Sequence, residues 1–308
     1  MSTIRKADGY HQPVLLLPSV DGLNIKPNGV YVDVTFGGGG HSREILKRLE
    51  NGRLIAFDQD PDAKRNAIDD PRFTLVDQNF RHMKNWIRLL GLKSVDGILA
   101  DLGVSSHQFD SEERGFSIRF DAALDMRMDQ SRTLTAAKVV NEYDEAKLKH
   151  VFRAYGELDN AGRIVRDIIQ SRPIHTSEEL KKAIERQLPK MKEHKVLAQI
   201  FQALRIEVNE ELDVLKDLLM QSSELLSASG RLVVISYHSL EDRLVKDFLK
   251  TGNFEGTPEK DFFGNLLRPF KPLSSKPILP LEEEIELNTR ARSAKMRVGE
   301  RIEVRGER

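Results

Sequence analysis

Four consecutive glycines and an aspartate about 20 residues further on form the pattern that most clearly points to chemistry. The glycines, Gly37 to Gly40, follow a strand-like run over 29–35 and precede a helix-like pattern that begins at His41. Glycine lets the backbone turn sharply and approach a ligand closely, and a helix N-terminus presents free N–H groups to it. Asp58 ends the next strand-like run, where a carboxylate can reach ribose hydroxyls. The pattern predicts a site for an adenosine-containing cofactor.

The glycine spacing argues against a nicotinamide dinucleotide as that cofactor. The dinucleotide fingerprint has a glycine at its third position, where this chain has Ser42 or Arg43, depending on which glycine begins the pattern. A methyl donor has no pyrophosphate and needs only an open glycine loop, an acid for the ribose and groups around the adenine. A tight strand-to-helix turn without a ligand is the alternative interpretation of the glycines.

Length and composition bound the remaining possibilities. A chain of 308 residues can bury a large core and can hold two domains. It has no cysteine, which excludes disulfides and thiolate chemistry. The apolar run at 14–17 is too short for a signal peptide, and no run approaches the length of a membrane span, so we expect a cytoplasmic protein. Because the net charge is zero, only a local basic patch could bind nucleic acid.

Strand-like and helix-like patterns alternate in the first third of the chain and predict a parallel α/β sheet. The predicted strands lie at 29–35, 53–57, 73–76, 95–100 and 231–235, with closing strands at 296–298 and 302–304. Ligands in such sheets bind at the carboxyl ends of the strands, and the polar residues of this chain that lie at or just after those ends are Asp33, Asp58, Asn79 and Asp101.

The middle of the chain has only helical patterns. A capping box at 176–179 opens one of them, and 251–280 reads as a long surface loop because it is rich in proline and glycine. We therefore expect an α/β domain formed by 1–116 and 206–308, with an all-helical insertion at 117–205.

Several longer motifs resemble one family of enzymes. These segments lie at 11–16, 35–42, 101–110, 114–117, 124–129, 201–206, 236–243 and 290–297. In this order they resemble the MraW/RsmH family, bacterial methyltransferases that use S-adenosylmethionine to modify N4 of a cytidine in 16S rRNA. The resemblance implies a Rossmann-like SAM-dependent methyltransferase fold with an inserted all-helical domain, and methylation of a decoding-centre cytidine in 16S rRNA of the small ribosomal subunit.

The resemblance also implies a set of site residues. The expected cofactor contacts are Gly38, Gly39, Gly40, His41, Asp58, Phe80, Asp101 and Gln108. The expected RNA contacts are Arg290, Arg292, Lys295 and Arg297. The helical insertion is a candidate for RNA recognition, since 134–205 has 14 Lys and Arg against 10 Asp and Glu; an ordinary solvated helix face is the alternative interpretation of that excess. A homodimer is compatible with the sequence, which does not decide the oligomeric state.

The chemistry of methyl transfer to an amine leaves alternatives for individual residues. Asp101 could accept a hydrogen bond from the substrate amino group, as a catalytic residue, or from the cofactor amino group, or it could cap a helix. His41 could cap the following helix or meet the cofactor carboxylate. Phe80 could pack on adenine or belong to the core. His238 could contact the base, or it could be structural.

No histidine pair has metal-ligand spacing, so we expect no catalytic metal. Two rival functions remain at this stage: a small-molecule methyltransferase, and a non-catalytic adenosyl-binding RNA module.

Overall fold

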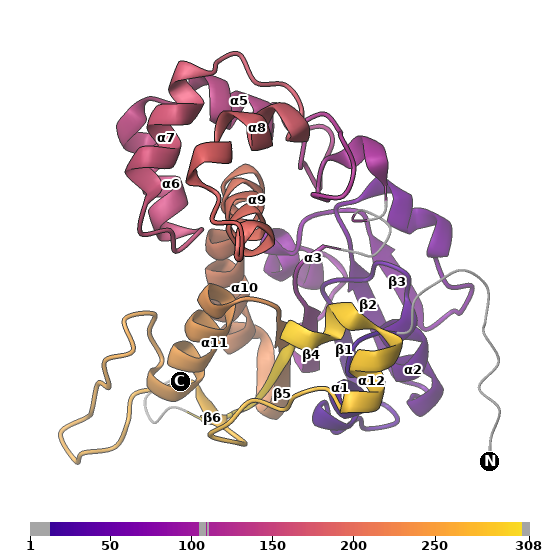
Figure 1. Ribbon diagram of the computed structural model, residues 1–308. Helices are drawn as coiled ribbons and strands as arrows, with labels where there is room; N and C mark the ends of the chain where they lie inside the picture. The colour runs from indigo at the N-terminus through magenta and orange to yellow at the C-terminus, as the bar shows by residue number, and fades with distance from the viewer. Residues whose placement is uncertain (1–12, 105–108, 110, 304–308) are drawn as a thin grey trace. The chain divides into compact units, whose positions relative to one another are not determined.

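The structure is a computed structural model that describes residues 13–104, 109 and 111–303. The chain divides into two compact units (Figure 1). A sheet unit comprises the described residues within Met1–Gly103 and Val214–Arg308, and a helical unit comprises those within Val104–Asp213. The helical unit is thus longer at both ends than the insertion expected at 117–205. The reason is packing, because Phe116 and Val208 are buried in the core of the helical unit.

The sheet unit is built on seven strands in the order β3-β2-β1-β4-β5-β7-β6. The strands are β1 (Val30–Asp33), β2 (Arg53–Phe57), β3 (Phe73–Val76), β4 (Val95–Asp101), β5 (Leu226–Ser236), β6 (Phe270–Pro272) and β7 (Lys295–Arg301). Strands β1 to β5 pair in parallel, and β7 runs antiparallel between β5 and β6. The strand order reverses between β1 and β4, which is where open α/β sheets bind ligands.

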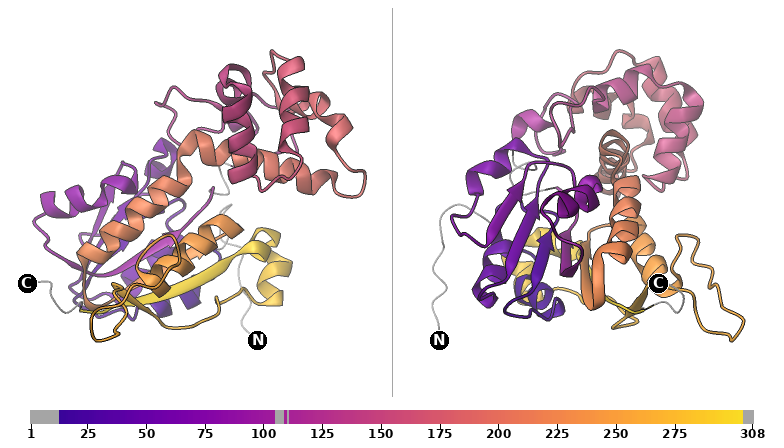
Figure 2. Two further views of the ribbon diagram at one scale, coloured as in Figure 1. Left: turned by 90° about the vertical axis from the view of Figure 1, so that its left-hand side faces the viewer. Right: turned by 180° about the vertical axis from the view of Figure 1, so that it is seen from behind.

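Helices cover both faces of this sheet (Figure 2). On one face pack α1 (Leu16–Gly22), α2 (Gly40–Arg48) and α12 (Glu282–Leu287); on the other pack α3 (Met83–Leu89), α10 (Glu211–Leu225) and α11 (Ser239–Thr251). Successive strand residues alternate between the two cores, as in β4, where Ile98 and Ala100 face one core and Leu99 faces the other. The short helices η1 (Pro61–Asn66), η2 (Phe80–His82) and η5 (Thr289–Ser293) complete the unit.

The helical unit has its own apolar core. Its helices are η3 (Glu112–Arg114), α5 (Ala136–Glu142), α6 (Glu145–Ala154), α7 (Ala161–Gln170), α8 (Ser177–Ala183), η4 (Glu185–Gln187) and α9 (Glu193–Asn209). Ile164, Val165 and Ile168 of α7 are fully buried in this core. The predicted capping box is confirmed: the Thr176 side chain accepts from the Glu179 N–H, and the Glu179 carboxylate accepts from the Thr176 N–H.

The strand predictions are confirmed except at the C-terminal edge of the sheet. Residues 302 and 303 are not in a strand, and 304 lies outside the described residues, so the described part of the expected strand at 302–304 is wrong. The edge strand is instead β6, within the segment that we expected to be a loop. Pro272 has no N–H to donate to a neighbouring strand, and an edge strand such as β6 tolerates this. None of the helices in the described part of the chain is long and apolar enough to cross a membrane.

Candidate functional site

The glycine loop between β1 and α2 has backbone conformations that favour glycine. Gly37 and Gly39 have φ angles of 50° and 74°, in the left-handed region. A Cβ atom added to Gly40 would lie 2.1 Å from Cγ of Pro13, whereas one added to Gly37 would meet no described atom within 4 Å. Close packing therefore requires glycine at position 40, and the loop leaves open space beside Gly37 in which a ligand can approach the backbone.

Asp58 connects the end of β2 to this loop. Its Oδ2 accepts a hydrogen bond from the Gly37 N–H (2.7 Å), and its Oδ1 accepts one from the Asp60 N–H (2.9 Å). Burial raises the pKa of the Asp58 carboxyl to about 6, although both hydrogen bonds favour the charged form. Each carboxylate oxygen has a further lone pair, so the group can still accept hydrogen bonds from two ribose hydroxyls.

Asp101 ends β4 and is held by two residues that are distant in the sequence. Its backbone N–H donates to Oγ1 of Thr35, and its Oδ1 accepts from the Tyr237 hydroxyl, both at 2.7 Å. The side chain is 22% exposed. Burial raises its pKa to about 6, while His41 and the Tyr237 hydrogen bond act in the opposite direction. Asp101 belongs to a strand, so the helix-cap interpretation is wrong.

Asp33, at the end of β1, is a third acid at this edge and is fully buried. Its Oδ2 accepts from the Ser42 hydroxyl (2.7 Å) and its Oδ1 from the Thr35 N–H (3.2 Å). Burial raises the pKa of this carboxyl, and the hydrogen bonds together with the nearby His41 oppose that rise. Both oxygens of Asp33 hold the glycine loop and the start of α2 against β1.

His41 is buried in the first turn of α2 and does not cap that helix. Its Nε2 lies 3.2 Å from the Val14 carbonyl oxygen, and its Nδ1 lies 3.9 Å from Oδ2 of Asp101. Because a carbonyl oxygen only accepts hydrogen bonds, Nε2 must carry the hydrogen, and Nδ1 faces Asp101. Because the N-cap of α2 is Gly39, helix capping by His41 is wrong, and its expected contact with the cofactor carboxylate stays a prediction.

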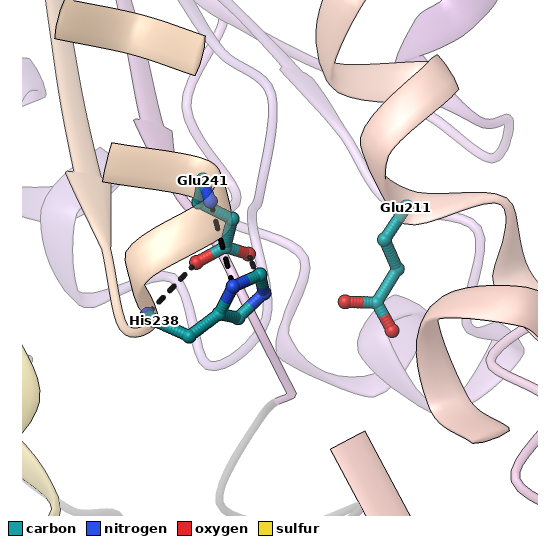
Figure 3. A group of neighbouring side chains, drawn as sticks. All are labelled: Glu211, His238 and Glu241. Atoms are coloured by element: carbon teal, nitrogen blue, oxygen red, sulfur yellow. Dashed lines mark hydrogen bonds and ion pairs between the residues drawn. The ribbon is translucent and has the colours of Figure 1, made fainter. Parts of the chain in front are cut away.

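His238 has a structural role at the start of α11. Its Nδ1 accepts from the Glu241 N–H (3.4 Å), and a Glu241 oxygen accepts from the His238 N–H (3.4 Å), which forms a capping box (Figure 3). Glu241 also accepts from the Tyr237 N–H (2.8 Å). Glu211, drawn in the same figure, belongs to the helical unit, where it accepts two hydrogen bonds from Arg205. His238 thus has the structural role that was one of its two interpretations, and its expected contact with the base stays a prediction.

Comparison with known proteins then identifies the family. The model of the MraW methylase family matches residues 8–302. The chain belongs to the MraW methylase family. Proteins named ribosomal RNA small subunit methyltransferase H are similar to it along almost their whole length. The protein from Flavobacterium johnsoniae is 61% identical over 95% of this chain and 98% of its own. The one from Flavobacterium psychrophilum is 62% identical over 93% and 100%, and the one from Bacteroides thetaiotaomicron is 56% identical over 95% and 97%.

The cofactor of this methylase is S-adenosylmethionine, and the residues at the strand ends fit it. The space beside Gly37 admits a ligand next to the backbone, and Asp58 lies at the same loop with acceptor capacity for ribose hydroxyls. Asp101 offers a carboxylate that can accept from an amino group. When bound, the cofactor supplies a methyl group on a positively charged sulfur.

Of two further residues expected to contact the cofactor, the structure describes Phe80 but not Gln108. Phe80 begins η2 and is half-buried, with its ring packed against the core on the α3 face of the sheet. It therefore has a core role, and its expected contact with adenine stays a prediction. Gln108 lies outside the described residues, so its expected role also stays a prediction. Asp60 caps η1 by accepting from the Asp62 N–H (3.0 Å).

The four basic residues expected to bind RNA are not equivalent in the structure. Arg297 donates two hydrogen bonds to Asp242 (2.6 and 3.2 Å), and its side chain is only 10% exposed. Nζ of Lys295 lies 3.7 Å from the same carboxylate. Arg290 is half-buried and Arg292 is exposed. Arg292 is thus the member of the group most accessible to a phosphate.

Sequence reasoning missed Thr35 and Tyr237, which hold Asp101. Tyr237 lies in the segment 236–243, where only His238 was weighed, because histidine is the commoner catalytic residue. Thr35 entered the sequence analysis only as the last residue of a predicted strand and the first of the segment 35–42. The signal for both residues was position: Thr35 ends the predicted strand at 29–35, and Tyr237 lies two residues after the one at 231–235, at the edge of the sheet that carries the acids.

Proposed function

We propose that this methylase transfers a methyl group from S-adenosylmethionine to N4 of a cytidine in the decoding centre of bacterial 16S rRNA. The observation that carries the proposal is the carboxylate of Asp101, fixed by Thr35 and Tyr237 at the end of β4, beside the strand that leads into the glycine loop. The names of the relatives, which refer to the small-subunit RNA, support the substrate class.

Cytosine N4 is a weak nucleophile because its lone pair is delocalised into the ring. The enzyme must therefore hold the amino group in line with the methyl group and accept hydrogen bonds from its hydrogens. Transfer forms the N4–carbon bond and breaks the carbon–sulfur bond; N4 then loses one proton. Above its pKa of about 6, Asp101 is charged and can accept a hydrogen bond from N4 or from the cofactor amino group. The first role makes it catalytic, and the second makes it a binding residue.

RNA recognition is assigned to two regions in this proposal. One is the helical unit, where Arg153, Arg163, Arg166 and Lys182 are exposed. The other is the C-terminal segment that contains Arg292. Exposed cations of this kind neutralise phosphates and position the RNA without reading its sequence.

The test is methyl transfer from labelled donor to three acceptors: purified 16S rRNA, assembled small subunits lacking the modification, and free cytidine nucleotides. We expect label in rRNA, free or assembled, and digestion followed by mass spectrometry should find it on cytosine N4. Labelling of free nucleotides with equal efficiency would favour a small-molecule enzyme. Donor binding and RNA binding without transfer to any acceptor would indicate a non-catalytic module.

A further inference from the structure

Tyr237 is fixed at both ends where the chain leaves β5. Its backbone N–H donates to Glu241 of α11 (2.8 Å), and its hydroxyl donates to Oδ1 of Asp101 (2.7 Å). Its ring lies against the turn after β4, since a Cβ atom added to Gly103 would lie 3.4 Å from Cδ2 of the tyrosine. The hydroxyl therefore has a single defined position relative to β4.

The hydroxyl also remains a donor over the range in which enzymes work. Burial, followed by the nearby acids Asp101, Glu241 and Glu284, raises the pKa of Tyr237 well above its ordinary value. The tyrosine thus stays protonated, and its hydrogen bond goes to a charged acceptor, which makes it stronger than a bond between neutral groups.

The two oxygens of Asp101 consequently have different surroundings. Oδ1 is occupied by Tyr237, whereas Oδ2 accepts no hydrogen bond from the described residues and has Nδ1 of His41 at 3.9 Å. A carboxylate whose one oxygen is fixed cannot rotate freely, so the direction of its other oxygen is set as well.

We propose that Tyr237 is a positioning residue of the methyl-transfer site: its hydroxyl holds Oδ1 of Asp101 and thereby directs Oδ2 at the amino group that Asp101 binds. The inference rests on the proposed function, because it assigns Asp101 an amino group, of either the cofactor or the cytosine. Tyr237 lies after the helical unit in the sequence. The reaction depends on this residue although it does not contact the reacting atoms.

Tyr237→Phe removes the hydroxyl and keeps the ring. The matched control is Tyr31→Phe: Tyr31 is also a buried tyrosine, in β1, and its hydroxyl accepts from the Lys26 N–H (2.7 Å) near the opposite end of the strand. With saturating RNA, Tyr237→Phe should lower kcat or raise the KM for the donor about 10- to 100-fold, the range expected for a charge-assisted hydrogen bond. The affected constant should be the one that Asp101→Asn affects, and Tyr31→Phe should change neither. Wild-type constants in Tyr237→Phe would overturn the inference.

The pH profile supplies a readout that a purely structural role would not move. The Tyr237 hydrogen bond favours charged Asp101, so its loss should raise the pKa of Asp101 further above about 6. The other groups that face Asp101, namely His41, Asp33 and Glu241, are unchanged in the variant. The acid limb of kcat/KM should therefore move to higher pH in Tyr237→Phe, even if part of the variant is unfolded, and not in Tyr31→Phe. An unmoved limb would count against positioning.

The double variant completes the test. If Tyr237 acts through Asp101, Tyr237→Phe added to Asp101→Asn should cost little more than Asp101→Asn alone. Losses that multiply would show that Tyr237 acts independently of Asp101 and would reject the inference. Calorimetry of donor binding without RNA tests this inference separately from the proposed function. If the wild-type enzyme methylates no RNA, the proposed function fails. A loss of donor affinity that Tyr237→Phe and Asp101→Asn share would still support the contact between Tyr237 and Asp101.

Discussion

Asp58 and Asp101 end strands β2 and β4 of the same sheet, and burial raises the pKa of both to about 6, yet the fold holds them differently. Asp58 is held by backbone N–H groups 21 and 2 residues away, one of them in the glycine loop itself. Asp101 is held by Thr35 and Tyr237, which are 66 and 136 residues away. Asp58 is thus oriented by the loop beside which it is expected to bind the ligand, whereas Asp101 depends for its orientation on elements that are distant in the sequence.

Asp70, an acid with an arginine partner, shows what these two lack. Arg72 holds the pKa of Asp70 down to about 2 through hydrogen-bonded ion pairing. Among the described residues, neither Asp58 nor Asp101 has an arginine or lysine partner. The fold therefore keeps two partly buried carboxylates without an arginine or lysine partner, at a cost in stability, in the place where a ligand with hydroxyl and amino groups is expected to bind.

Asp58→Ala should have the largest effect, because it removes the predicted ribose acceptor and also releases the Gly37 N–H of the loop. Each charge-assisted contact contributes about 1.5–3 kcal/mol, and the variant loses the contacts to two ribose hydroxyls, so donor affinity should fall by about 100-fold or more. Calorimetry with S-adenosylmethionine measures this, and Asp69→Ala, an exposed acid in the same segment, is the control. Unchanged donor affinity in Asp58→Ala would remove Asp58 from the site.

Asp101→Asn should decide which amino group Asp101 binds. The amide keeps an acceptor oxygen for Tyr237 but loses the charge and presents a donor to the ligand. If Asp101 accepts from cytosine N4, turnover should fall about 10²-fold at saturating donor, the scale of a positioned acid–base group. If it binds the cofactor amino group, which we favour, the donor KM should rise and saturating donor should restore turnover. If turnover and the donor KM both keep their wild-type values, both roles of Asp101 are excluded.

The stability of the same variant should depend on pH in a defined direction. The folded protein binds the Asp101 proton more tightly than the unfolded chain, since its pKa is about 6 instead of 3.8. Stability is therefore lost as the pH rises from about 4 to 6 and stays lower above that. Asp101→Asn, which has no charge to bury, should raise the free energy of unfolding by about 1–2 kcal/mol at pH 8 without donor, a value reduced for partial solvent exposure.

Thermal or urea unfolding at pH 4 and pH 8 checks this expectation. The gain should be largely absent near pH 4, where the Asp101 carboxyl of the folded wild type is protonated and no charge is buried. Asp70→Asn is the control with the opposite sign, because the pKa of Asp70 is lowered and its charge favours the folded state. Equal stability of Asp101→Asn and wild type at both pH values would show that burying this charge costs nothing.

The contrast between the two acids also explains what the sequence could predict. Asp58 was found from a local spacing, because its partners lie within its own βα segment. Strands β2 and β3 were predicted with their observed bounds for the same reason: alternation and turn residues are local signals. The position of Asp101 was predicted, but not its attachment to Tyr237, because that contact exists only once β4 and β5 pair. Strand β6 was missed because proline normally signals a loop, and pairing with β7 overrides that signal at an edge.

The smallest expected effect concerns basic side chains, which, like the two acids, are either hydrogen-bonded within the protein or accessible to a ligand. Arg297 is engaged, since Asp242 accepts both of its hydrogen bonds, and Arg292 is exposed. Arg292→Gln should therefore lower the slope of log affinity for rRNA against log salt by about 0.7–0.9, one phosphate contact, without changing stability. Arg297→Gln should leave the slope unchanged and lower the melting temperature, because it leaves Asp242 without its main partner.

Filter binding from low to moderate salt distinguishes the two variants. Equal slopes in Arg292→Gln and wild type would mean that the C-terminal segment makes no phosphate contact through Arg292, and the helical unit would then be the remaining candidate for the RNA interface.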